Sequence, residues 1–195
     1  MLSVLRPSRL FIIASFLATF FLPAIAAEAD SAVTAFVNRI NATVSPIEPG
    51  DGASIRAACA KLVAQTFDFN AMAPAIADGA WSRMNGEQRS AYVQGLQRRA
   101  AADCASHGNE IAGNTVELVG VREGDGGDHL VAVRQSQGRG RTVIWQVRKT
   151  AAGSLRAVDM TVDGRSLAVS ARRDASDVLN RTGGDVTALI RSVGG

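Results

Sequence analysis

Histidine and cysteine are scarce in this chain of 195 residues, which has two of each. His107 and His129 are too few and too far apart for a metal-ligand cluster, and the spacing of Cys59 and Cys104 matches no zinc pattern. The sequence also has no G-x-S-x-G nucleophile motif and no glycine-rich phosphate loop between a strand and a helix. We therefore expect no catalytic residue, no metal and no cofactor, and interpret both histidines as solvated side chains.

The N-terminus has the three parts of a secretory signal. Arg6 and Arg9 precede an apolar run over residues 10–22 (LFIIASFLATFFL), which Pro23 interrupts, and Ala24-Ile25-Ala26 supplies small residues for a signal peptidase. The alternative is an uncleaved membrane anchor, but a membrane-spanning helix needs about 20 apolar residues and this run is shorter. The pattern predicts an exported protein.

Cleavage after Ala26 or Ala27 would leave a single domain and change its charge. The whole chain has 21 Lys+Arg and 18 Asp+Glu, and loss of Arg6 and Arg9 leaves 19 against 18, a net charge of +1. Nucleic-acid binding domains usually carry a strongly basic face. The sequence therefore predicts a signal peptide at residues 1–26, one domain at 27–195 and no nucleic-acid partner.

The two cysteines are an even number in a protein predicted to be exported, which favours a disulfide. Cys59 and Cys104 both fall in predicted helices, so a bridge would link two helices. The alternative is a pair of buried thiols that act as small apolar residues.

Apolar residues recur at helical spacing over residues 30–106 and again over 166–193. Between these two regions they alternate with polar residues, as in strands. The pattern predicts helices over 30–44, 53–67, 68–80, 85–106, 166–180 and 185–193, with Trp81–Met84 as a bridge between two of them. It predicts strands over 115–121, 129–135, 142–149 and 155–162, joined by short glycine-containing turns. Such segregated runs predict an α+β fold in which helices pack on a curved four-stranded antiparallel sheet.

Several residues mark the expected helix ends. Asn85 with Gln88 three residues later has the form of a capping box, and Gly108 is the expected stop of that helix. Ser166 or Asp163 is the expected N-cap of the helix after the last strand.

Four segments resemble motifs of the MlaC family of periplasmic phospholipid-transport proteins, also called the toluene-tolerance family. They are LVAQTFDFNAMA at 62–73, Trp81 with EQR at 87–89 and Tyr92, VDMTVDGRSL at 158–167 with Arg172, and the tail from Gly184 to Ile190. The resemblance covers residues 62–193, about two-thirds of the chain.

The resemblance implies a function as well as a fold. The MlaC-like (NTF2-like) fold holds a lipid cavity between sheet and helices. The family is periplasmic and binds phospholipid acyl chains. It exchanges lipid with an inner-membrane ABC transporter complex and an outer-membrane lipoprotein complex. Such a carrier requires no catalysis, in agreement with the missing catalytic motifs.

The chain departs from the family pattern at four positions where the family has larger aromatic side chains. These positions hold Leu155, Val158, Ala171 and Ala175. Large-to-small changes reshape a pocket, and a branch associated with hopanoid metabolism shares the fold. A hopanoid-associated lipid-binding protein is therefore the alternative ligand class.

Under the carrier hypothesis, apolar residues of the helices and strands line the lipid cavity. They are Phe69, Met72, Ile76, Trp81, Tyr92, Leu96, Val131, Val133, Val143, Trp145 and Leu167. Each could equally be a core residue. Arg172 and Arg173 are candidates for contact with a head group or partner, or for helix-surface salt bridges. Two other functions stay open: a periplasmic protein-binding adaptor without lipid, and a small enzyme, which would need an acid–base pair that the sequence does not supply.

Overall fold

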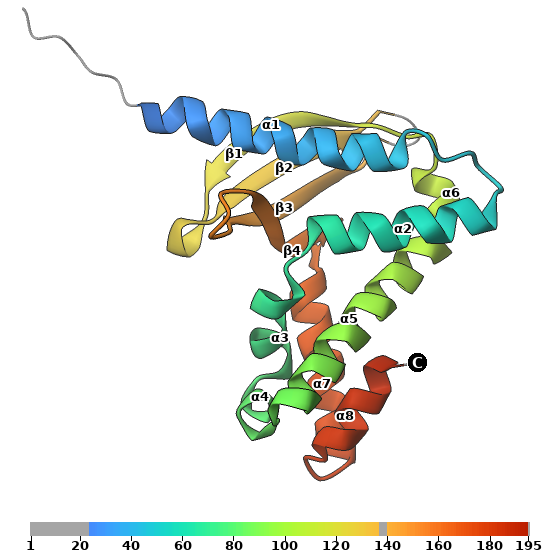
Figure 1. The fold of residues 1–195 in the computed structure, drawn as a ribbon, viewed down its shortest axis with the longest axis vertical. Coiled ribbons are helices and arrows are strands. Elements are labelled where there is room, and N and C mark those ends of the chain that lie inside the picture. The colour runs from blue at the N-terminus through green and yellow to red at the C-terminus, as the bar shows by residue number, and fades with distance from the viewer. Residues whose placement is uncertain (1–23, 137–139, 195) are drawn as a thin grey trace, which may run out of the picture.

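The computed structural model describes residues 24–136 and 140–194, and most of the predicted signal peptide lies outside them. The helices are α1 (Ala24–Val44), α2 (Gly52–Thr66), α3 (Phe69–Ala77), α4 (Gly79–Arg83), α5 (Gly86–Ser106), α6 (Gly108–Ile111), α7 (Leu167–Arg181) and α8 (Val186–Gly194). The strands are β1 (Val116–Glu123), β2 (His129–Gln135), β3 (Thr142–Lys149), β4 (Leu155–Val162) and β5 (Arg165–Ser166). A sheet with α1 lies above a group of helices (Figure 1).

The sheet is an antiparallel meander of order β1-β2-β3-β4-β5, as the alternating pattern predicted for its first four strands. The predicted bounds of β2, β3 and β4 are confirmed. The fifth strand was not predicted, because it has two residues and pairs with β4 across a tight turn at Asp163 and Gly164. Both turn residues have positive φ, 49° and 76°. The predicted α+β fold is correct, with one additional strand.

Helix α1 packs across one face of the sheet and fills it with side chains. The Phe36 ring contacts the Trp145 ring edge-on at 5.7 Å between centroids, and Phe67 approaches Trp145 from the end of α2 at 5.4 Å. Val131 and Val133 of β2 are fully buried in the same core. Burial of each such side chain contributes about 1.5–3 kcal/mol, so this interface is a main source of stability.

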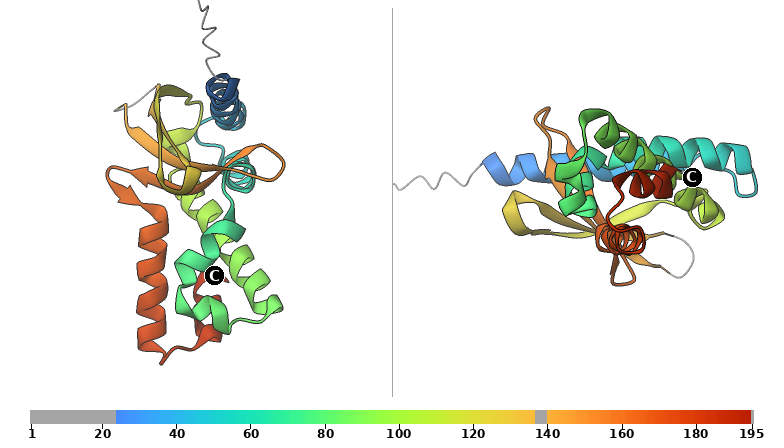
Figure 2. Two further views of the ribbon diagram at one scale, coloured as in Figure 1. Left: turned by 90° about the vertical axis from the view of Figure 1, so that its left-hand side faces the viewer. Right: turned by 90° about the horizontal axis from the view of Figure 1, so that it is seen from below.

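Helices α3, α4, α7, α8 and most of α5 form a second layer below one end of the sheet, whereas α2 and α6 lie level with the sheet (Figures 1 and 2). Helix α5 packs against α2 and α8, and α3 packs against α7. The crossing of α5 and α8 is close, because a Cβ added at Gly95 would lie 2.6 Å from Cγ2 of Val193. The C-terminal helix is therefore a fixed part of this layer.

One prediction of helix bounds was wrong. The predicted helix over 68–80 is split into α3 and α4 at Asp78, and Trp81 lies in α4 and not in a bridge between helices. The predicted end of α5 is confirmed, because the helix ends at Ser106; the short helix α6, which begins at Gly108, was not predicted. At Asp78 a single turn reorients the chain while the apolar spacing continues, so periodicity alone does not detect the break.

The predicted helix caps are confirmed. The Asn85 side chain accepts from the Gln88 amide at 2.8 Å, and the Gln88 side chain accepts from the Asn85 amide at 3.0 Å, which completes the capping box. Ser166 Oγ accepts from the Val169 amide at 3.0 Å at the start of α7. These caps fix where α5 and α7 begin.

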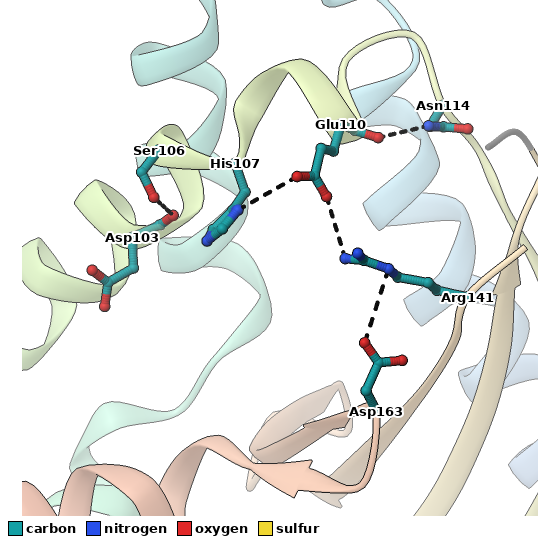
Figure 3. A network of polar contacts seen from close by, with 7 residues as sticks. All are labelled: Asp103, Ser106, His107, Glu110, Asn114, Arg141 and Asp163. Carbon is teal, nitrogen blue, oxygen red and sulfur yellow. Dashed lines mark hydrogen bonds and ion pairs between the residues drawn. The ribbon is translucent and has the colours of Figure 1, made fainter. Parts of the chain in front are cut away.

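An exposed polar network connects α6 with the β4–β5 turn (Figure 3). Arg141 contacts Glu110 at 3.2 Å and Asp163 at 3.9 Å, and the His107 ring lies 3.7 Å from Glu110. The His107 side chain is 72% exposed, which agrees with its interpretation as a solvated residue. Exposed pairs of this kind contribute little to stability.

The predicted disulfide is present between Cys59 of α2 and Cys104 of α5, with Cα atoms 5.7 Å apart. It spans a sequence separation of 45 residues. Cys59 is buried, so the bridge lies at the packed interface of the two helices.

Replacement of both cysteines by alanine (C59A with C104A) should lower the free energy of unfolding by about 3–4 kcal/mol, because the loop is no longer closed in the unfolded chain. Urea unfolding with and without reductant measures this. The reduced wild-type protein should match the double variant, which should itself not respond to reductant. A wild-type midpoint that reductant leaves unchanged would contradict the prediction.

The buried carboxylate of Asp128 links the turn before β2 to strand β3. The Asp128 side chain is fully buried and accepts hydrogen bonds from Arg148 at 2.6 and 2.9 Å and from Gln146 at 2.7 Å. Burial raises the pKa of Asp128, but the hydrogen bonds from Arg148 and Gln146 outweigh it and hold the pKa below its usual value. Asp128 is therefore ionised in the folded protein.

Substitution of Asp128 by asparagine (D128N) should lower the free energy of unfolding by about 1–3 kcal/mol at neutral pH. The loss is smaller than for a wholly buried ion pair, because the Arg148 side chain is 53% exposed. Since the folded-state pKa is depressed, this stabilisation is present above the unfolded-state pKa, about 3.9, and is lost as pH falls through the folded value. Urea unfolding should show a smaller difference in the free energy of unfolding between wild type and D128N at pH 3 than at pH 7. The matched control is D125N in the same turn, and an advantage independent of pH would refute this account.

Candidate functional site

A pocket of about 460 Å³ lies between the α3–α4 corner and α7. These helices are neighbours in the lower layer, away from the face of the sheet that α1 covers (Figures 1 and 2). The volume falls within the range of about 300–1,000 Å³ that is typical of small-molecule sites. The pocket is therefore large enough to hold part of an organic ligand.

The pocket has an apolar floor and a polar rim. Ile76, Ala77 and Ala80 on the α3–α4 side are buried, and Leu179 of α7 faces them. The other lining residues are Asp78, Gly79, Arg83, Arg172 and Ser176. An apolar floor with a few charged groups at the opening suits an amphiphile, whose tail leaves water while its head stays at the surface.

Helix α7 is positioned by the carboxylate of Asp159 in β4. Asp159 Oδ1 accepts a hydrogen bond from the Ala168 amide at 2.9 Å, and Asp159 Oδ2 accepts one from Ser166 Oγ at 2.6 Å. Ser166 also caps the helix, so one carboxylate fixes both the direction and the start of α7. The D…S spacing in VDMTVDGRSL thus has a structural role, and it determines where the α7 side chains face the pocket.

Two guanidinium groups stand at the rim. Arg172 pairs with Asp78 at 2.9 Å, from Nη2 to Oδ2, across the opening between α7 and the α3–α4 corner. Arg83 Nη1 donates to the Gly184 carbonyl at 2.9 Å in the α7–α8 connection. The rim therefore carries two positive charges and one negative charge, and anionic groups would be attracted to it.

A smaller cavity of about 80 Å³ lies where β4 meets α2, α3 and α5. Phe67, Phe69 and Val93 contribute to its walls, and so does Arg156. Arg156 donates to the carbonyls of Gln65 and Ala64 at 2.7 and 2.8 Å. Those bonds keep the guanidinium on the chain's own backbone, so this cavity is a packing feature of the sheet–helix junction.

The residues predicted to line a lipid cavity do not lie in one place. Ile76 lines the larger pocket and Phe69 the smaller one. The others in the core are buried or partly buried: Met72, Tyr92, Leu96, Val131, Val133, Val143 and Trp145. Trp81 is partly buried with the Arg89 guanidinium 5.2 Å from its ring, and Leu167 is 40% exposed at the start of α7. Arg172 is at the pocket rim, whereas Arg173 is exposed outside the lining.

Two buried polar atoms of the predicted set, Tyr92 Oη and Trp145 Nε1, have no hydrogen-bond partner among the described residues. Burial raises the pKa of Tyr92 to about 12, although Arg99 acts in the opposite direction. The phenol is therefore a neutral donor at physiological pH.

Among residues 24–136 and 140–194, His, Cys, Asp and Glu form no group of three or more that could hold a metal ion. In the same part of the chain, no helix has the length and apolar character needed to cross a membrane. His129 is partly buried beside Asp128.

Most of the pocket lining was not predicted from the sequence. Asp78, Arg83, Ser176 and Leu179 were not singled out, because they lie on two helical segments that are about 90 residues apart in the chain. One signal was present: Arg172, Ser176 and Leu179 follow the i, i+4, i+7 spacing of a single helix face.

Comparisons with known proteins agree with the fold. A search of curated proteins finds no match. A solved structure, a phospholipid-binding protein from Ralstonia solanacearum in complex with a phospholipid, superposes with a TM-score of 0.64 at 17% sequence identity. The match covers 87% of this chain and 92% of that one. The family model described as "MlaC protein" matches residues 31–193, and the chain therefore belongs to the MlaC family.

Proposed function

We propose that this protein is a periplasmic carrier that takes up phospholipid acyl chains in the pocket between α3–α4 and α7. The main support for this function is the pocket itself, which has a buried apolar floor and a rim with two arginines. Membership of the MlaC family supports it, and so does the fold shared with a phospholipid-bound protein. The remaining predicted residues, Met72, Tyr92 and Leu96 among them, would line the path of longer chains.

The energetics explain why a carrier is needed. Each methylene removed from water contributes about 0.8 kcal/mol, so a chain of about fifteen methylenes is held in a bilayer by about 12 kcal/mol. A protein pocket must offer comparable apolar contact if the lipid is to cross an aqueous compartment. No bond is made or broken in this process, so the proposed protein is not an enzyme.

As such a carrier, the protein would be exported, would exchange lipid with membrane complexes and would bind one class of lipid. Residues 1–26 would direct the chain to the periplasm and be removed, which leaves a single lipid-binding domain at 27–195. Lipid would be exchanged with an inner-membrane ABC transporter complex and an outer-membrane lipoprotein complex, the partners implied by the family. A hopanoid-type lipid is the alternative ligand, because Leu155, Val158, Ala171 and Ala175 are smaller than the aromatic residues that the family has at these positions.

Filling the pocket should weaken lipid uptake. Ser176 is exposed and lines the pocket, so S176W would place an indole in the opening without disturbing a buried residue. We expect affinity for a fluorescent-tailed phospholipid to fall about tenfold or more, because overpacking of this size typically costs 1–3 kcal/mol. Fluorescence titration of the purified protein measures this.

The matched control is D177W, which places the same side chain on the next residue of α7, outside the pocket lining. It should bind phospholipid like wild type, and both variants should unfold at the wild-type temperature. Equal affinity of S176W and D177W for phospholipid would exclude this pocket as the binding site.

A further inference from the structure

Asp78 holds a backbone conformation that aspartate rarely adopts. Its φ of 51° and ψ of −134° correspond to the first central position of a type II′ turn, which ordinarily requires glycine. Its amide donates to the Pro74 carbonyl at 3.1 Å, and its carbonyl accepts from the Trp81 amide at 3.0 Å. Such strain persists where the surroundings enforce it and is concentrated at functional sites. The carboxylate is thus fixed at the α3–α4 corner, at the pocket opening.

The Asp78 side chain reaches the opposite wall of the pocket. It pairs with Arg172 at 2.9 Å, and the two side chains are 67% and 56% exposed. An ion pair this exposed to water is weak, because solvent screens the charges and two flexible side chains must be ordered. The pair can therefore be displaced by a ligand that offers Arg172 a better partner.

Phosphate is such a partner. A guanidinium binds phosphate oxygens in a bidentate arrangement, and these charge-assisted hydrogen bonds are stronger than those of neutral groups. Arg83 adds a second positive charge at the same rim. A phosphate that approaches Arg172 also meets the negative charge of Asp78, which must be displaced before the phosphate can bind.

We propose that Asp78 is a specificity-determining residue: its carboxylate occupies Arg172 in the empty pocket and yields to the phosphate of a bound amphiphile. This rests on the proposed lipid-carrier function and adds the head group to it. Neutral amphiphiles have nothing to displace the pair and bind through the apolar floor alone. Arg172 thus gives the preference for phosphate-bearing lipids, and its pairing with Asp78 limits both that preference and the affinity, which favours release.

The test compares two fluorescent-tailed probes with identical acyl chains, phosphatidylglycerol and diacylglycerol, in titrations of the purified protein. Asp78→Asn should bind phosphatidylglycerol about two- to fivefold more tightly than wild type, because an exposed competing pair is removed. Arg172→Gln should bind it about tenfold more weakly, because a charge-assisted hydrogen bond is lost. Neither variant should change the affinity for diacylglycerol.

The control is Asp174→Asn, which breaks another exposed ion pair of α7, with Arg99 at 2.9 Å, outside the pocket. It should leave both affinities at the wild-type value. If Asp78→Asn binds phosphatidylglycerol no more tightly than Asp174→Asn, Asp78 does not compete with the head group and the inference is wrong. Failure of wild type to bind either probe would overturn the carrier function together with this inference.

A further arm separates a lipid head group from free phosphate. Inorganic phosphate in large excess should leave phosphatidylglycerol bound, because without acyl chains it gains nothing from the floor of the pocket. If inorganic phosphate displaces the lipid from wild type and does so more readily from Asp78→Asn, the rim is a site for free phosphate and the lipid assignment is overturned.

Discussion

The contact between Phe36 and Trp145 determines where this protein can hold a ligand. Helix α1 places the phenyl ring against the indole at the centre of the sheet, and Phe67 closes the same core from the end of α2. The buried face of β2 and β3 is thereby filled with side chains. Space for a ligand is instead found in the lower layer, where α3–α4 and α7 meet with a pocket between them.

Three contacts hold the helices of the lower layer in place. Asp159 in β4 fixes the start of α7, the disulfide between Cys59 and Cys104 joins α5 to α2, and Gly95 allows α8 to pack closely on α5. Helix α3 also packs against α7, and at the pocket opening the exposed Asp78–Arg172 pair is a weaker contact between the same two sides. A rigid frame with a weak connection at the opening is what a carrier needs in order to bind and release a ligand.

Much of the fold could be predicted from the sequence, because its signals are local. Alternation gave β2, β3 and β4, the Asn85–Gln88 spacing gave the start of α5, and the cysteine count with the predicted export gave the disulfide. The pocket could not be predicted in the same way. It depends on the break at Asp78, where apolar spacing runs on through a turn, and on the approach of two distant segments, which no local pattern encodes.

The most direct test of the carrier account is to purify the protein under native conditions and to analyse an organic extract by mass spectrometry. The account predicts a phospholipid in about equimolar amount with the protein. A triterpenoid in that amount would instead assign the hopanoid-type ligand. An extract without lipid, from a protein that also fails to bind an apolar probe, would contradict the account and favour a protein-binding adaptor.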